Sequence, residues 1–589
     1  MSRANSDVPQ IGARTVTGIR QRIDSFGVAA AHPESVEREV ALSAAGGWAE
    51  IVAPAALAAA VFFFNLWKYG FWEPDEARYA EIAREMVQGG SYLVPHLNYV
   101  IYVEKPPLLY WLTSLSFGIF GIDEFAARFF VALFGVLGVA VTAWFAARCF
   151  GRRHAILAGA ILATIPLYAV MAQVLTTDVM LSVFVTIANF ALFMHWRDGG
   201  RWCWAAYVAV ALGVLTKGPV AVVLPTIAMG AFLIWQRDWR GSIRRFHLFA
   251  GVALIAAISA PWFVAMIAWV PGYFDFYFVG EHLRRAFVES YSHGEPFYFY
   301  IPVLAAGLLP WSMLVPFLTW RRLVPNPARR FCLMAAATTV AAFSCSSAKL
   351  IPYILPAVPP LAILIADGIV SCGWPGERSP TVPKPDSRIL TESGPLLGIL
   401  GAIAIMAGIF APAMRSPYPM YVRPALYAAG GLLVFGGAIT TIMFMSRRIA
   451  GGLAALVLTM AATLMAATGA RIEAEPLRSY ANLARAIESQ APDAAVICYH
   501  RYVQALPFYT RKRIVLVGAR TELGFGSKLD PDAGQYFLKT DDDLMRLWRS
   551  PGPKVLVLDE ADLARLNEQL GGFTQIGSEF HKRAIEKAQ

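Results

Sequence analysis

Charged residues are scarce in this chain: they make up 16% of its 589 residues, against roughly 25% in a typical soluble protein. The scarcity excludes an array of soluble domains, which length alone would favour. It also excludes a disordered chain, because 57% of the residues are hydrophobic. The composition therefore indicates a membrane protein.

Cysteines and nucleotide motifs are also lacking. Six cysteines in a chain of this length cannot form the dense disulfide framework of a small secreted protein. There is no Walker loop, no convincing Rossmann glycine fingerprint and no HExxH sequence. The net charge of +10 predicts no nucleic-acid partner, because in a membrane protein the excess of Lys and Arg is first explained by the positive-inside rule.

Long apolar runs fill the first 470 residues. A spanning helix needs about 20 mostly apolar residues, and thirteen runs meet or approach that length. The thirteen predicted spans are residues 48–67, 125–149, 154–173, 179–196, 202–216, 219–236, 246–270, 300–320, 331–347, 350–371, 395–414, 424–446 and 449–469. Residues 108–121 are apolar but too short to span, so we expect an interfacial or re-entrant helix there.

The charge of the loops predicts the orientation in the membrane. When residues 1–47 are placed in the cytoplasm, every inner loop is basic, as the positive-inside rule requires. The inner loops carry Arg148, Arg152, Arg153, Arg197, Arg201, Arg237, Arg240, Arg244, Arg245, Arg321, Arg322, Arg329, Arg330, Arg378, Lys384, Arg388, Arg447 and Arg448. An odd number of spans then puts the C-terminus outside. Because the Ala- and Arg-rich composition is typical of bacteria, we expect the inner membrane, with the periplasm outside.

The last part of the chain changes character. Apolar runs shorten to strand length at residues 494–500, 513–518 and 554–560, and helical patterns lie between them. Alternating strands and helices predict a soluble α/β domain. The predicted organisation is a cytoplasmic tail (1–47), a transmembrane domain (48–470) with outer loops at 68–124 and 271–299, and a periplasmic α/β domain (471–589).

The first outer loop carries the sequence EPDEARYAEIAREM at residues 73–86. Pro74 suits a first helical position, and the acids that follow suit the positive N-terminal end of a helix. Asp75, Arg78 and Tyr79 are spaced to share one face of this helix. Asp75 is therefore a candidate functional carboxylate, although a first-turn acid without further function has the same pattern.

A second cluster follows Tyr102 and reads Glu104-Lys105-Pro-Pro. The two prolines fix an extended turn, so Lys105 lies beside the membrane in a position to meet a lipid phosphate. The alternative is a charged turn that caps an amphipathic helix. A divalent metal bound by Glu104 and His282 is a weaker alternative, because a lone histidine is usually a hydrogen-bonding surface residue. No other cofactor is expected.

Further candidates stand at the outer ends of predicted helices. Asp178 is either a functional acid or a helix cap. A single lysine at such a position usually snorkels to the interface, but cations are disfavoured on this side, so several of them together indicate an anionic ligand. These candidates are Lys217, Lys349 with the nearby Tyr353, Arg284 and Arg285.

The predicted membrane interior holds almost no ionisable residue, and Asp367 lies near the inner end of its helix. A proton-coupled transporter or a lipid-sugar flippase is expected to carry ionisable residues at mid-bilayer. The pattern instead favours an enzyme that works at the outer membrane surface on lipid-attached substrates. Without a nucleotide site, such an enzyme must take its activated group from a lipid.

Five motifs occur in order: EPDEARYAEIAREM, EKPP, TTDVMLSVF, LTKGP and KLIPYILPAVPPLAIL. They resemble the bacterial 4-amino-4-deoxy-L-arabinose lipid A transferases and, more broadly, the polyprenyl-phosphate-sugar transferases related to protein O-mannosyltransferases. The resemblance implies the GT-C fold with a periplasmic domain. It also implies inverting transfer of aminoarabinose from undecaprenyl phosphate to a lipid A phosphate, and with it resistance to polymyxin and cationic peptides.

Within that implied reaction, Asp75 is the carboxylate expected beside an oxocarbenium-like transition state. Asp178 or Glu104 is expected to pair with the amine of the sugar. The cations Lys105, Arg78, Lys217, Lys349, Arg284 and Arg285 are expected to offset the charges of the two phosphates, with Tyr79, Tyr102 and Tyr353 completing the substrate site. A related transferase that uses another sugar or a protein acceptor remains the main alternative, and a flippase is less favoured.

Overall fold

The computed structural model describes residues 48–284, 295–317, 326–373, 388–413, 418–519, 521–579 and 581–587. The chain divides into two units after Trp48. The predicted cytoplasmic tail, residues 1–47, lies outside the described residues. Everything that follows concerns the second unit, from Ala49 onward.

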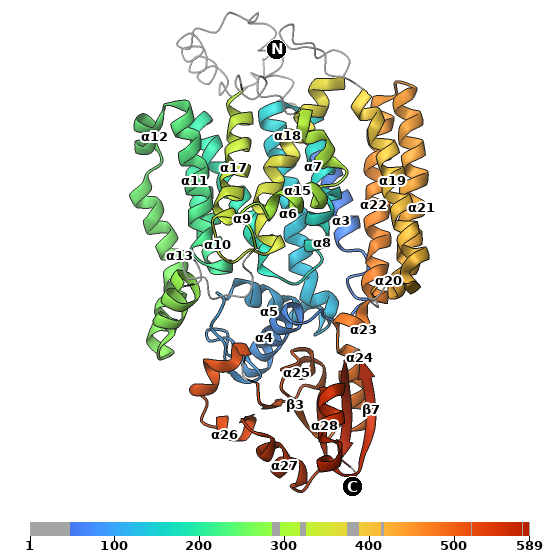
Figure 1. Ribbon diagram of the computed structural model, residues 1–589. Helices are drawn as coiled ribbons and strands as arrows, with labels where there is room; N and C mark the ends of the chain where they lie inside the picture. Colours follow the sequence, from blue (N-terminus) through green and yellow to red (C-terminus); the bar gives the residue numbers. More distant parts are fainter. Residues whose placement is uncertain are drawn as a thin grey trace, which may run out of the picture. The chain divides into compact units, whose positions relative to one another are not determined.

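Long helices form a bundle (Figure 1). Among the described residues, seven helical segments are long and apolar enough to cross a membrane. They are contained in α6 (Glu124–Phe150), α9 (Thr177–Asp198), α13 (Leu248–Trp269), η4 (Ile351–Ala357) with α18 (Val358–Gly373), α19 (Arg388–Phe410) with η5 (Ala411–Ala413), α21 (Arg423–Met445) and α22 (Ile449–Glu473). Four apolar helices are shorter: α3 (Ala49–Phe62), α5 (Leu108–Phe120), α10 (Trp202–Lys217) and α11 (Val220–Gln236).

Every predicted span contains helix, while the number of thirteen spans stays a prediction. The run 154–173 is divided into α7 (Arg152–Thr164) and α8 (Pro166–Met171), because the ring of Pro166 cannot continue the backbone hydrogen bonds of α7. The run 300–320 contains only α15 (Tyr300–Gly307) and the 3-10 turn η3 (Trp311–Phe317) in its described part. The run 331–347 falls within α17 (Pro327–Ser344) except for its last residues.

The two ends of the bundle differ in composition. The basic helix α12 (Trp239–Arg245) lies at one end, where the turn between α21 and α22 also carries Arg447 and Arg448 (Figure 1). The motif helix α4 (Asp75–Gly89) lies at the other end beside α5 (Figure 1). The Phe120 ring at the end of α5 packs 4.7 Å from that of Phe129 in α6, and the expected interfacial or re-entrant position of α5 stays a prediction. The basic loops and the first outer loop, which carries the motif at residues 73–86, are therefore at opposite ends of the bundle.

After α22, the short helix α23 (Glu475–Arg478) leads into a six-stranded sheet with the order β5-β4-β3-β6-β8-β7. The predicted strands are confirmed as β3 (Ala495–Tyr499), β4 (Val515–Val517) and β6 (Lys554–Asp559), which are parallel. β5 (Phe537–Leu538) adds a parallel edge, and β8 (Lys582–Lys587) pairs antiparallel with both β6 and β7 (Phe573–Glu579). β5, β7 and β8 were not predicted from the sequence.

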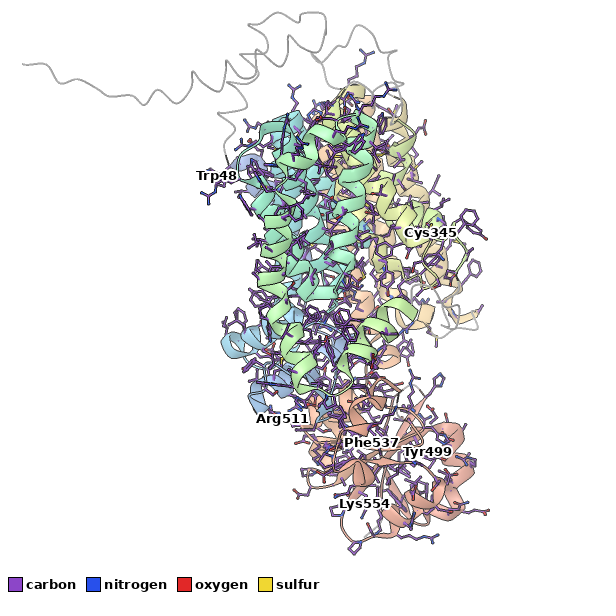
Figure 2. The ribbon with its side chains drawn as sticks, turned by 90° about the vertical axis from the view of Figure 1, so that its left-hand side faces the viewer. Trp48, Cys345, Tyr499, Arg511, Phe537 and Lys554 are labelled. Atoms are coloured by element: carbon purple, nitrogen blue, oxygen red, sulfur yellow. The ribbon has the colours of Figure 1, made fainter. Side chains whose placement is uncertain are left out.

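The two faces of this sheet bury alternate residues of each strand, as strand geometry requires. One face packs on α24 (Ala481–Gln490) and α25 (Ala505–Thr510) within the main hydrophobic core. The other face packs on α27 (Asp541–Arg549) and α28 (Glu560–Leu570). Arg511, at the end of α25, marks the junction between the sheet domain and the bundle in Figure 2.

The sheet domain is bonded directly to the first outer loop. The carboxylate of Glu73 accepts hydrogen bonds from the backbone N–H groups of Gln504 and Ala505, at 3.2 and 2.6 Å, where α25 begins. The side-chain amide of Asn98 exchanges two hydrogen bonds with the backbone of Ile514, at 2.9 and 2.7 Å. Because these contacts satisfy backbone groups of the sheet domain, they fix its orientation on the loop.

A buried ion pair anchors the motif helix to the bundle. Arg128 of α6 donates to both carboxylate oxygens of Glu76, each at 2.8 Å. Glu76 also accepts from the backbone N–H of Leu175, at 2.9 Å, in the turn before α9. Both members of the pair are almost fully buried, and a two-point guanidinium–carboxylate contact fixes direction as well as distance. The first turn of α4 is thereby held against α6 and α9.

Candidate functional site

A cavity of about 160 Å³ lies between the first outer loop and the ends of the membrane helices. The predicted residues that line it are Glu104, Lys105, Asp178, Lys217 and Tyr353. Its remaining lining residues are Leu181, Val220, Tyr277, Phe343, Pro352 and Pro356. The fold thus brings together four of the motifs that are far apart in the sequence, and the apolar residues supply a wall beside the charged ones.

Lys217 and Asp178 form an ion pair inside this cavity. The Lys217 Nζ lies 2.5 Å from the Asp178 Oδ1, and both side chains are largely buried. Asp178 stands in the first turn of α9 and Lys217 is the last residue of α10, so each charge lies at the helix end whose dipole favours it. The Lys217 ammonium also lies 4.3 Å from the centre of the Tyr353 ring, within the range of a cation–π contact.

The pair changes the interpretation of both residues. Lys217 is paired with Asp178 inside the cavity, so it is not a lysine that snorkels to the interface. Asp178 does not act as a helix cap through its side chain, because its carboxylate meets Lys217. The predicted pairing of Asp178 with the amine of a sugar would therefore have to compete with Lys217.

Asp75 lies at the edge of this arrangement. Its side chain is 55% exposed and stands 3.5 Å from Arg78 Nη1, one turn further along α4. Asp75 does not line the cavity, but it interacts electrostatically with Lys217, which does. The carboxylate of Asp75 is therefore more than half exposed and lies within electrostatic range of the buried Lys217.

Two predicted tyrosines lie behind the charged residues. Tyr102 donates a hydrogen bond from its hydroxyl group to Glu104 Oε2, at 3.0 Å. Burial raises the pKa of Tyr79, and the negative charges of Asp75, Asp178 and Glu104 raise it further. Burial and Glu104 likewise raise the pKa of Tyr102. Both phenols therefore keep their protons at neutral pH, and that of Tyr102 is donated to Glu104.

Arg78 touches a residue that the sequence did not predict. Its Nε lies 3.3 Å from Glu522 Oε1, in the sheet domain. Burial works against the charge of Arg78, but Tyr102, Glu522, Tyr79 and Asp75 together hold its pKa well above the usual value. Glu522 lies in the turn η6 (Thr521–Gly524), where no motif, spacing or periodicity in the sequence marks a functional residue.

The other predicted residues are placed differently. Lys349 is buried, and its Nζ donates to the backbone carbonyl oxygens of Glu295 and Ser346, at 2.9 and 2.7 Å, rather than lining the cavity. The side chains of His282 and Arg284, and all of Arg285, lie outside the described residues.

The described part of the chain contains no group of three or more His, Cys, Asp or Glu side chains able to hold a metal ion. Glu104 lines the cavity, but the side chain of its predicted partner His282 is outside the description. The metal at Glu104 and His282 therefore stays a prediction.

Two parts of the chain match known protein families. Residues 104–265 match the family described as dolichyl-phosphate-mannose-protein mannosyltransferase. Residues 483–587 match the aminoarabinose transferase C-terminal domain. The first match covers the cavity residues from Glu104 to Lys217, and the second covers nearly all of the sheet domain.

Similar proteins agree with these matches. Undecaprenyl phosphate-alpha-4-amino-4-deoxy-L-arabinose arabinosyl transferase from Shewanella sediminis is 35% identical over 51% of this chain and 56% of its own length. The protein of the same name from an Enterobacter species is 32% identical over 63% of this chain and 68% of its own length. The crystal structure of ArnT from Cupriavidus metallidurans bound to undecaprenyl phosphate is similar over 92% of this chain and 99% of that chain, with a TM-score of 0.80 and 25% identity.

The helical bundle, the outer motif loop and the attached sheet domain are those of a membrane glycosyltransferase of the GT-C fold. Within that class, the chain belongs to the family of the undecaprenyl phosphate-alpha-4-amino-4-deoxy-L-arabinose arabinosyl transferases. The matched region spans between about half and two thirds of the length of the curated relatives, for example 56% of the Shewanella protein and 64% of the one from Erwinia tasmaniensis.

Proposed function

We propose that this chain transfers 4-amino-4-deoxy-L-arabinose from undecaprenyl phosphate to a phosphate of lipid A. The observation that carries the proposal is the cavity, in which Lys105 and Lys217 lie beside Glu104, Asp178 and an apolar wall. Two cations suit a lipid phosphate, acids suit the amine of the sugar, and an apolar wall suits a prenyl chain. The likeness to a structure bound to undecaprenyl phosphate supports the same donor.

The reaction brings the phosphate of the donor and the phosphate of the acceptor close together. Because both are anions, cations are needed to offset their repulsion. An oxygen of the acceptor phosphate attacks the anomeric carbon of the sugar, the bond from that carbon to the donor phosphate oxygen breaks, and undecaprenyl phosphate leaves. The attack comes from the face opposite the leaving group, so the configuration inverts. Lys105 and Lys217 offset the charge of the donor phosphate, and the carboxylate of Asp75 stabilises positive charge on the sugar. The second pKa of a phosphate is about 6, so a strong base is not required.

Lys105 provides a first test of the donor site. A charge-assisted contact to a phosphate is worth roughly 1.5–3 kcal/mol, so we expect Lys105→Ala to weaken binding of undecaprenyl phosphate by about ten- to a hundredfold. The measurement is binding to the purified protein in nanodiscs. Lys68→Ala is the matched control, because Lys68 is an exposed lysine of the same outer loop. Equal binding by Lys105→Ala and Lys68→Ala would move the phosphate site to Lys217.

We further propose that the cavity and the sheet domain face the periplasm, with the basic end of the bundle in the cytoplasm. The distribution of basic loops supports this orientation through the positive-inside rule. In a Cys345→Ser background, which removes the one exposed cysteine among those that the structure describes, Asn567→Cys on α28 is expected to react with a membrane-impermeant maleimide in intact spheroplasts. Arg240→Cys on α12 is expected to react only after lysis. The reverse pattern would contradict the orientation.

Mass spectrometry of lipid A from cells with and without this chain tests the function directly. We expect aminoarabinose on lipid A, and resistance to polymyxin, only when the chain is present, because an added amine reduces the negative charge of lipid A. The match to a protein mannosyltransferase family makes a protein acceptor the second candidate. Unmodified lipid A together with newly glycosylated protein would favour that candidate.

A further inference from the structure

One segment of the sheet domain lies between two outer loops of the membrane domain. It comprises η6, Phe525 and η7 (Gly526–Lys528). The Phe525 ring lies 4.7 Å from the ring of Phe276 in the π-helix η2 (Asp275–Arg284). Gly526 lies so close to the first loop that an added Cβ would stand 2.1 Å from the carbonyl oxygen of Ile101. The segment therefore has a fixed place beside the loop that supplies Tyr102, Glu104 and Lys105.

Glu522 is the charged residue that this segment directs toward the site. Its Oε1 accepts a hydrogen bond from Gln504 Nε2, at 2.7 Å, and lies 3.3 Å from Arg78 Nε. The Glu522 side chain is 10% exposed and that of Arg78 is 14% exposed. Arg78 thus lies between two carboxylates, Glu522 on the sheet domain and Asp75 at 3.5 Å on its own helix.

Docking of the sheet domain does not depend on this ion pair. Glu73 and Asn98 already bond to the backbone of the domain, and Arg485 on α24 lies 2.8 Å from Glu124 of α6. The pair between Glu522 and Arg78 contributes a direction to the Arg78 side chain rather than the attachment of the domain.

We propose that Glu522 is a positioning residue for the transfer reaction, and that it acts through Arg78 on Asp75. The proposal rests on the proposed function. A guanidinium group shared by two carboxylates cannot turn fully toward either of them. With Glu522 in place, Arg78 is held away from a closer contact with Asp75, so the negative charge of Asp75 remains available to the sugar. Without Glu522, Arg78 turns to Asp75 and neutralises the charge that the transition state needs.

The test compares Glu522→Gln with Glu560→Gln. Glu560 is a matched control, because it is an exposed acid of the same domain and pairs with Arg583 at 2.9 Å, away from the site. We expect Glu522→Gln to lower kcat by about ten- to a hundredfold, with the KM for the donor and the Tm unchanged. That loss corresponds to one charge-assisted contact. Glu522→Asp keeps the charge on a shorter side chain and is expected to restore part of kcat.

A double-mutant comparison separates positioning from structure. If Glu522 acts through Arg78, Glu522→Gln adds no further loss in a chain that already carries Arg78→Lys. Independent losses that multiply would overturn the proposal, as would a kcat for Glu522→Gln equal to that of Glu560→Gln. Should Glu522→Gln lower the Tm, Glu522→Asp decides: a Tm equal to that of the parent chain with no recovery of kcat overturns the proposal.

The outcomes also separate this proposal from the proposed function. A parent chain that transfers no aminoarabinose to lipid A would overturn the proposed function, and the role of Glu522 with it. An active parent chain whose kcat is indifferent to Glu522→Gln would overturn only the role of Glu522.

Discussion

Replacing Asp75 with asparagine is expected to lower kcat by roughly a hundred- to a thousandfold, the range found when one electrostatic contact to a transition state is removed. Asparagine keeps the shape of the side chain and removes its charge. As the bond between the anomeric carbon and the donor phosphate breaks, positive charge develops on the sugar. A nearby carboxylate stabilises that charge, which is present only in the transition state. The loss is therefore expected in kcat rather than in binding of the donor.

The exposure of Asp75 makes this variant informative. Its side chain is 55% exposed, so its replacement leaves no buried hole and the Tm is expected to stay within about 1 °C of the parent value, in line with surface substitutions. Asp542→Asn is the matched control, because Asp542 is also an exposed acid in the first turn of a helix. Near-normal modification of lipid A by Asp75→Asn would remove Asp75 from the catalytic role.

The sequence predicted the residues of the site better than the contacts between them. Asp178 and Lys217 were each recognised as a charge at a helix end, because a charge there stands out against long apolar runs. Their ion pair joins residues 39 positions apart, and no local pattern expresses such a distance. Glu522 was missed for the same reason, since only the docking of the sheet domain brings it to Arg78.

The elements of the fold were likewise predicted only in part. β3, β4 and β6 were predicted because buried parallel strands read as continuous apolar runs bounded by turns. β7 and β8 form an antiparallel pair at the edge of the sheet, and several residues of β7 are exposed, so the pair lacks such a run. The single predicted helix at 154–173 is two helices, because Pro166 ends the backbone hydrogen bonds of α7. Edge strands and helix breaks inside apolar runs depend on packing that hydropathy alone does not report.

Replacing Lys217 with methionine is expected to have an effect of similar size, by a different route. Methionine retains the apolar length of the side chain and removes its charge, which leaves the buried carboxylate of Asp178 without its partner at 2.5 Å. Breaking a buried ion pair from one side costs about 3–5 kcal/mol, because one charge is left buried and uncompensated. We expect a lower Tm, loss of undecaprenyl phosphate binding and no measurable transfer.

The double variant Lys217→Met/Asp178→Asn distinguishes the two consequences. It removes both charges, so most of the Tm is expected to return. Transfer is not expected to return, because the cation that offsets the donor phosphate is still missing. Asp178→Asn alone keeps that cation and is expected to lose less transfer than Lys217→Met. Lys349→Met serves as a comparison, since Lys349 is buried but does not line the cavity. Recovery of transfer in the double variant would show that Lys217 only neutralises Asp178, and the cation for the donor phosphate would then be Lys105.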